Sequence, residues 1–189
     1  MVVHTDCRYY KGSMPCAFHK RDGRLCEGCT DYDPIKTRIL VIKLAAVGDV
    51  LRTTSILPPL KQKYPGSEIT WVTKASAAPL LKGNTFVDRL LLVEENYIEF
   101  LKHEQFDVGI CLDADPLSAT IHSLAECATR FGFVTDKAGK VTTVNEAALE
   151  WWHMGVTTIT SRRRTGRPIS RSCMRFADCH CRHTLRNSP

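Results

Sequence analysis

The feature that most constrains this chain of 189 residues is a series of short apolar runs separated by segments with helical spacing. The first run, residues 38–44, reads Arg-Ile-Leu-Val-Ile-Lys-Leu and is nearly continuous, as in a strand that is covered on both faces. Further strands are predicted at residues 68–73, 87–93, 106–112 and 129–133. Strands alternating with helical segments predict parallel βαβ units. We therefore expect an α/β fold with a doubly wound, Rossmann-like parallel sheet.

The segments between these runs predict the helices. Residues 50–63 carry an apolar stripe, which Asp49 can cap and which Pro58-Pro59 should kink or split. Shorter helices are expected at residues 75–81, 96–103 and 117–127.

Charge divides the chain into three regions. The net charge is +6, but residues 157–189 hold eight arginines, no lysine and a single acidic residue, Asp178, so the rest is almost neutral. We expect residues 35–156 to form the globular domain, and the arginine-rich tail to be disordered or the product of a shifted reading frame. No apolar run approaches the roughly 18 residues that span a bilayer, and the first residues lack a signal-peptide core, so we expect a cytoplasmic protein.

Residues 1–34 form a polar, cysteine-rich segment. They contain Cys7, Cys16, Cys26 and Cys29, and without an export signal such a cluster favours metal binding over disulfides. The Cys26-x2-Cys29 pair suits one ion. We expect a structural zinc site with these four ligands; an iron–sulfur cluster and unligated thiols are the alternatives.

The loop after the first strand excludes two nucleotide-binding motifs. Gly48 is the only glycine in residues 43–50. A dinucleotide-binding turn needs the three glycines of G-x-G-x-x-G, and a P-loop needs G-x-x-x-x-G-K-[ST]. NAD is therefore not expected as a cofactor. Ligands of open α/β sheets bind at the carboxyl ends of the strands, so residues 44–52, 73–77 and 113–118 are the expected functional edge. Asp49 is either an ordinary helix cap or a carboxylate that can accept a proton.

The same loop carries a resemblance to a known family. The stretch from Ile39 to Val72 resembles the opening of heptosyltransferase-like glycosyltransferases of family 9: a strand, a loop ending in Gly48-Asp49, a helix, Pro65-Gly66 and a second strand. Residues 78–88, Ala-Pro-Leu-Leu-Lys-Gly-Asn-Thr-Phe-Val-Asp, are similar to the segment that follows in that family. The resemblance extends from about residue 38 to about residue 155.

The resemblance implies the N-terminal acceptor domain of an inverting, metal-independent GT-B transferase that works in the cytoplasm or at the inner face of its membrane. Asp49 would be the catalytic base, and the candidate substrate-binding residues are Lys43, Gly48, Arg52 and Asp113. The implied partners are a nucleotide-sugar donor such as ADP-heptose and a lipopolysaccharide-core or related glycan acceptor. Many members have Ser-Ser where this chain has Ala45-Ala46. The family also has a second, donor-binding domain, so the chain resembles an N-terminal fragment that is inactive alone.

Two other functions are weighed against this one. A non-enzymatic zinc-binding module could bind nucleic acid through its basic tail, but the neutral globular region disfavours nucleic acid as a partner. A redox protein using Cys26 and Cys29 is disfavoured because that pair precedes the first strand.

Overall fold

The computed structural model describes residues 2–95 and 98–156. Expectations for the arginine-rich tail, and for the start of the helix at residues 96–103, lie outside the described residues. The strands of this part of the chain are β1 (Thr37–Ile42), β2 (Ser67–Thr73), β3 (Arg89–Leu92), β4 (Gln105–Cys111), β5 (Glu126–Thr135) and β6 (Val141–Thr143). Its helices are α1 (Ala17–Asp22), α2 (Val47–Thr53), α3 (Leu57–Lys63), α4 (Ala78–Leu81), α5 (Ile98–Leu101), α6 (Pro116–Leu124) and α7 (Glu146–Val156), with a 3-10 turn, η1 (Thr54–Ile56), between α2 and α3.

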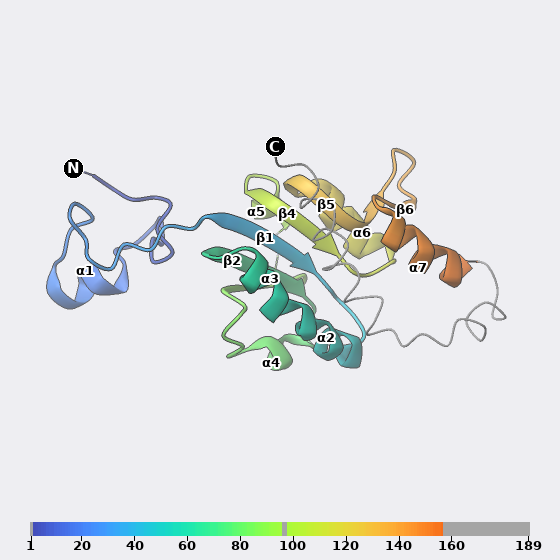
Figure 1. The fold of residues 1–189 in the computed structure, drawn as a ribbon, viewed down its shortest axis with the longest axis horizontal. Helices are drawn as coiled ribbons and strands as arrows, with labels where there is room; N and C mark the ends of the chain where they lie inside the picture. Colours follow the sequence, from blue (N-terminus) through green and yellow to red (C-terminus); the bar gives the residue numbers. More distant parts are fainter. Residues whose placement is uncertain (1, 96–97, 157–189) are drawn as a thin grey trace, which may run out of the picture.

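The described strands form one six-stranded sheet in the order β3-β2-β1-β4-β5-β6 (Figure 1). The first five run parallel, and only β6 pairs antiparallel, with β5. This is the strand order of a doubly wound Rossmann-type sheet, in which the chain reverses direction across the sheet between β1 and β4. The predicted fold class is confirmed as a mixed, mostly parallel α/β sheet.

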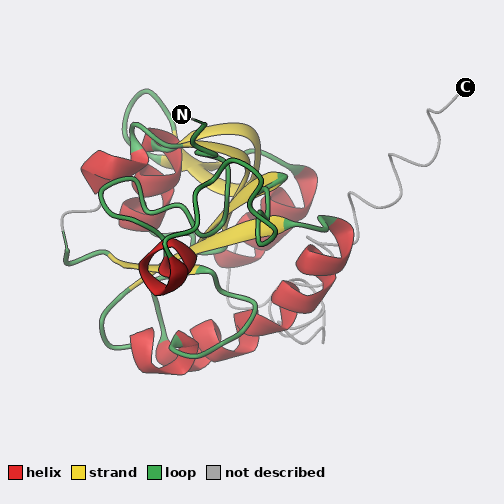
Figure 2. Ribbon diagram, turned by 90° about the vertical axis from the view of Figure 1, so that its left-hand side faces the viewer, coloured by secondary structure: helices red, strands yellow, loops and turns green. Residues whose placement is uncertain are grey.

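Two hydrophobic clusters cover the two faces of the sheet. One contains Ile39 and Val41 of β1 with the apolar residues of α2, η1, α3 and α4. The other contains Leu40 and Ile42 with residues of α5, α6 and α7. All four of these β1 side chains are fully buried, as the continuous apolar run predicts. Helices flank the strands on both sides (Figure 2).

Several element boundaries differ from the predicted ones. The first helix begins at Val47, with Ala46 as its N-cap, so Gly48 and Asp49 are helical residues and Asp49 is not the cap. The predicted break at the prolines is present: η1 separates α2 from α3, and Pro58 lies in the first turn of α3. The helix expected at residues 117–127 ends at Leu124, because the backbone from Glu126 onward pairs with β4.

Strand β6 was missed by the sequence analysis. It forms a hairpin with β5 through a turn in which the Asp136 carboxylate accepts hydrogen bonds from the amides of Ala138 and Lys140, both at 2.8 Å. Gly139 has a φ of 73°, a conformation that glycine adopts without strain. The sequence pattern Asp136-x-x-Gly139, with Val-Thr pairs at residues 134–135 and 141–142 on either side of it, could have predicted this hairpin.

The N-terminal segment lies at the amino ends of the strands (Figure 1). Arg8 fixes it there: its guanidinium contacts Asp33 at 2.9 Å, Asp88 at 2.8 Å and the carbonyl oxygen of Ser67 at 3.1 Å. The Asp88 carboxylate also accepts the ammonium of Lys61 at 2.5 Å and the amide of Ile69 at 2.7 Å. Asp88 therefore joins this segment to β2 and α3.

Candidate functional site

The candidate site lies where the chain leaves β1 and β4 at their carboxyl ends. These two strands are neighbours and run parallel, with Ile42 opposite Cys111. The chain continues from β1 into α2 on one face, and from β4 into α6 on the other. Such a reversal opens a crevice at the strand ends, where ligands of open α/β sheets bind. The structure therefore brings two of the three expected edge loops, those after β1 and β4, directly together.

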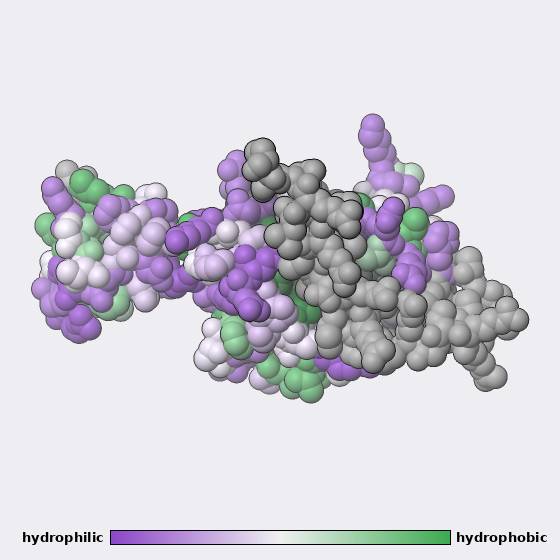
Figure 3. All heavy atoms as spheres, in the orientation of Figure 1, coloured by the Kyte–Doolittle hydropathy of each residue, from purple (hydrophilic) through white to green (hydrophobic). Residues whose placement is uncertain are grey.

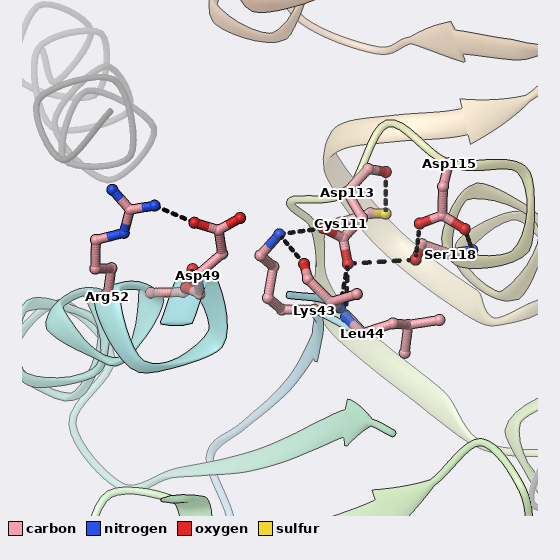
Figure 4. A network of polar contacts seen from close by, with 10 residues as sticks. Lys43, Leu44, Asp49, Arg52, Cys111, Asp113, Asp115 and Ser118 are labelled. Atoms are coloured by element: carbon pink, nitrogen blue, oxygen red, sulfur yellow. Dashed lines mark hydrogen bonds and ion pairs between the residues drawn. The ribbon is translucent and has the colours of Figure 1, made fainter. Parts of the chain in front are cut away.

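Asp113 is the central polar residue of this edge (Figure 4). Its carboxylate forms an ion pair with the Lys43 ammonium and accepts hydrogen bonds from the amide of Leu44 at 2.6 Å and the amide of Ala45 at 3.4 Å. The side chains of Lys43 and Asp113 are only 10% and 9% exposed. The Lys43 ammonium also donates to the carbonyl oxygen of Ala45 at 2.6 Å. This buried pair ties the loop after β1 to the loop after β4.

A second carboxylate, Asp115, starts α6. It accepts the amides of Leu117 at 3.0 Å and Ser118 at 3.2 Å, the geometry of a helix N-cap, and Pro116 occupies the first helical position. The Ser118 hydroxyl donates to Asp115 at 2.5 Å and lies 3.4 Å from Asp113. The sequence analysis did not single out Ser118, although its place three residues after an N-cap aspartate was the available signal.

Asp49 differs from Asp113 in its exposure. It lies in the first turn of α2, and its side chain is 40% exposed. It forms an ion pair with the guanidinium of Arg52, whose side chain is 54% exposed and lies one helical turn further on. The positive end of the helix dipole favours a negative charge at this position. Asp49 is thus an accessible carboxylate next to a buried one (Figure 4).

Ala46 and Gly48 lie at the start of α2, close in sequence to Asp49. A Cβ atom at Gly48 would meet nothing within 4 Å, so packing does not require glycine there. The expectation that Gly48 forms a turn before the helix is wrong, because Gly48 lies inside α2. Ala46, the N-cap, makes no side-chain capping hydrogen bond. A serine at this position, as in the resembled family, could supply that bond.

The predicted site residues thus fall into two groups. Lys43 and Asp113 pair with each other in the buried network, whereas Gly48, Asp49 and Arg52 line the exposed first turns of α2. All five lie at the carboxyl end of β1 or β4. Their roles in catalysis and substrate binding stay predictions.

The four N-terminal cysteines lie far along the chain from this edge but near one another. Cys7, Cys16, Cys26 and Cys29 all line a single cavity of about 220 Å³. Among the described residues, no three His, Cys, Asp or Glu side chains are grouped closely enough to hold one metal ion. The zinc site therefore stays a prediction.

Two further cysteines of the described chain belong to the core. Burial raises the pKa of the Cys111 thiol to about 12, and burial also raises the pKa of the Cys127 thiol. Since the thiolate is the form that binds metals and attacks electrophiles, these two cysteines are inert. In residues 2–95 and 98–156, none of the helices has the length and apolarity needed to cross a bilayer.

Comparisons with known proteins give matches among solved structures. No protein-family model and no curated protein matches the chain. The chain is similar to the Escherichia coli heptosyltransferase WaaC with ADP (24% identity, TM-score 0.45, covering 50% of this chain and 34% of that one). It is also similar to E. coli ADP-heptose lps heptosyltransferase II (26% identity, TM-score 0.45, covering 50% and 30%). A third is a glycosyl transferase of family 9 from Veillonella parvula (24% identity, TM-score 0.46, covering 52% and 32%). The chain spans about a third of the length of these glycosyltransferases, and it is similar to them over about half of its own.

Proposed function

We propose that residues 35–156 are the acceptor-binding half of a heptosyltransferase-like glycosyltransferase. The whole enzyme would transfer a sugar from a nucleotide-sugar donor of the ADP-heptose kind to a lipopolysaccharide-core or related glycan acceptor. The ordered motifs from Ile39 to Asp88 support this proposal. The observation that carries it is the contrast between the two carboxylates at the carboxyl end of the sheet: Asp113 is buried in an ion pair, and Asp49 is accessible.

Asp49 is the residue that we assign as catalytic base. A hydroxyl oxygen of the acceptor attacks the anomeric carbon of the donor and forms the new glycosidic bond. The bond from that carbon to the nucleotide diphosphate breaks, and the diphosphate leaves with the electron pair. The hydroxyl proton passes to the Asp49 carboxylate. Attack opposite the leaving group inverts the anomeric centre, and no step requires a metal ion.

The neighbouring residues support this role through position and charge. Arg52 pairs with the Asp49 carboxylate across one helical turn and has further N–H donors exposed. Those donors suit phosphate or carboxylate groups on an acceptor. Lys43 and Asp113 hold the loops after β1 and β4 in a fixed relation, so the base keeps its place relative to a bound acceptor. Gly48 leaves open space beside Asp49 for the acceptor sugar.

The test is the substitution Asp49→Asn in a protein that joins this domain to a nucleotide-sugar-binding domain. The rate of sugar transfer, followed by release of the nucleotide diphosphate, is expected to fall by roughly two to four orders of magnitude, the usual contribution of a general base. Donor affinity should stay the same, because the other domain binds the nucleotide. The unfolding midpoint should change little, because Asp49 is not the N-cap and its ion pair is exposed.

A matched control is Asp115→Asn. Asparagine caps a helix about as well as aspartate, so α6 should be preserved while the charge at Asp115 is removed. We expect this variant to keep most of its transfer activity. Full activity of Asp49→Asn, together with loss of activity in Asp115→Asn, would assign the base to the loop after β4 and contradict the proposal.

A further inference from the structure

The N-terminal segment is folded without a core of its own. None of residues 2–36 is buried, including every residue of α1. Its large apolar side chains lie at the surface, visible as the hydrophobic patches on the N-terminal lobe in Figure 3. Segments of fewer than about 40 residues usually need a cross-link, a metal or association to be stable. The four cysteines of this segment are free thiols, so a bond between two of them is a cross-link that its own residues can supply.

Cys26 and Cys29 lie at the two ends of one tight turn. The amide of Cys29 donates to the carbonyl oxygen of Cys26 at 3.1 Å, and Gly28, at the third position of the turn, has a positive φ of 72°. The Cα atoms at the two ends of a β-turn are less than about 7 Å apart, and a disulfide needs a separation of about 4.4–6.8 Å. The backbone therefore holds this pair at a distance that a disulfide can span.

An ion pair closes the base of the same turn. Arg24 and Asp31 flank the two cysteines along the chain, and the Arg24 guanidinium contacts the Asp31 carboxylate. Arg24 also donates to the hydroxyl of Thr30 at 3.2 Å. Cys26 and Cys29 border the same cavity and are partly exposed, so a small reagent in the solvent can reach them.

The other cysteines of the described chain are placed differently. Cys16 is the N-cap of α1, and its sulfur accepts the amide of the third residue after it at 3.5 Å. Cys7 forms a β-bridge with Pro34, outside the turn. Cys111 and Cys127 belong to the sheet domain, where burial raises the pKa of both thiols and so lowers the fraction of the reactive thiolate. The pair in the turn is therefore accessible and held together by the backbone.

We propose that Cys26 and Cys29 form a reversible redox pair, which becomes a disulfide on reaction with a small-molecule disulfide such as oxidised glutathione. One cysteine thiolate attacks a sulfur atom of the small molecule, whose S–S bond breaks and releases one thiolate. The other cysteine thiolate attacks the resulting mixed disulfide, so that the Cys26–Cys29 bond forms and the second small thiolate leaves. The protein pair loses two electrons and two protons, and the small disulfide gains them as two thiols.

The disulfide cross-links a segment that is attached to the sheet domain far from the candidate site. Arg8 of this segment contacts Asp88 at the amino ends of the strands, whereas Asp49 and Asp113 lie beyond the carboxyl ends. The pair is thus a switch of the N-terminal segment and not the active site of a redox enzyme. This inference goes beyond the proposed glycosyltransferase function and does not depend on it.

The test equilibrates the full chain with mixtures of reduced and oxidised glutathione, followed by acid quenching, alkylation and digestion with trypsin. Cleavage after Arg24 and Lys36 releases residues 25–36, which contain Cys26 and Cys29 and no other cysteine. In oxidising mixtures, we expect this peptide to lose both alkyl groups and to be two hydrogen atoms lighter than the dithiol. The peptides 1–8 and 12–20, with one cysteine each, should not be cross-linked to it.

Serine variants separate this pair from the other cysteines. Cys26→Ser and Cys29→Ser should abolish the disulfide, whereas the matched controls Cys7→Ser and Cys16→Ser should keep it. The near-ultraviolet circular dichroism of the buried Trp71 reports on the sheet domain and should be unchanged in all four variants. In the unmutated chain, oxidation should slow the cleavage of residues 2–36 by a non-specific protease, and Cys26→Ser should remove this difference.

The contribution of the turn is measured by comparison with the unfolded chain. The folded chain should be half oxidised at a lower ratio of oxidised to reduced glutathione than the same chain in concentrated urea, because the turn holds the two thiols together. Equal ratios would overturn the proposal. Two thiols that stay reduced in the most oxidising mixture, with or without bound zinc, would also overturn it, as would a bond from either cysteine to Cys7 or Cys16.

Discussion

Replacing Asp113 by alanine is expected to lower the free energy of unfolding by about 3–5 kcal/mol. The Lys43 side chain is only 10% exposed, and without its partner the ammonium becomes an uncompensated buried charge, for which this range is typical. The amides of Leu44 and Ala45 lose their acceptor at the same time. With a urea dependence of about 2 kcal/mol per molar, the midpoint of unfolding should fall by roughly 2 M. Urea titration followed by far-ultraviolet circular dichroism measures this shift.

A double-mutant cycle with Lys43→Met separates the ion pair from other effects. Methionine keeps most of the length of the lysine side chain and removes the charge. If the cost of Asp113→Ala comes from stranding a buried ammonium, the double variant should be more stable than Asp113→Ala alone. The coupling free energy should lie in the range of about 1–3 kcal/mol found for residues in contact.

The exposed pair at the same edge of the sheet provides the control. Asp49→Ala removes a carboxylate that is 40% exposed, and the expected loss is about 1 kcal/mol or less. Equal losses for Asp49→Ala and Asp113→Ala would refute the reasoning from burial. Strict additivity of Lys43→Met and Asp113→Ala would refute the assignment of the cost to their ion pair.

The remaining predictions concern three other positions. Ala46→Ser should raise the stability by about 1 kcal/mol by supplying the missing cap of α2, which thermal unfolding would detect; no change would mean that the serine does not cap. Gly48→Ala should keep or slightly raise the stability, because its Cβ meets open space, yet it should weaken acceptor binding in a titration if the acceptor occupies that space. Burial, with a smaller effect of Arg130, lowers the pKa of His122. The unfolded chain therefore binds this proton at higher pH than the folded one, and stability should fall as the pH drops below about 6.5. Urea midpoints between about pH 7.5 and 5.5 should show this slope, and His122→Leu should flatten it.

The sequence by itself determined the architecture of the sheet domain. The apolar run of β1 is continuous from Ile39 to Ile42, as burial on both faces demands, so this strand was predictable from the local sequence pattern alone. Local signals also located the break between α2 and α3, because proline fits the first turn of a helix but not its interior. The same signals missed where α2 begins: neither Ala46 nor Val47 is a helix-start residue, and the helix forms there without a side-chain cap.

Pairing between strands set the boundary between α6 and β5, which the local sequence pattern did not predict. Residues 126–127 look like the end of a helix in sequence, but pairing with Gln105 and Phe106 of β4 makes them the start of β5. The edge of β4 offers hydrogen-bond partners to the backbone of β5. The free energy gained from these hydrogen bonds outweighs a weak helical preference of the first β5 residues. The four-residue α4 and α5 likewise owe their extent to packing, since helices this short are not stable alone.

The candidate site shows the same division. The sequence was sufficient to place Lys43, Asp49 and Asp113 at the carboxyl edge, because the strand order of a doubly wound sheet fixes which loops meet there. Only the tertiary structure decided their different states, because burial depends on what the two loops place around each carboxylate. Asp113 lies between both loops and is neutralised by Lys43, while Asp49 projects from an exposed helical turn. Likewise, the spacing of the four cysteines did not define their common cavity; the turns around it did.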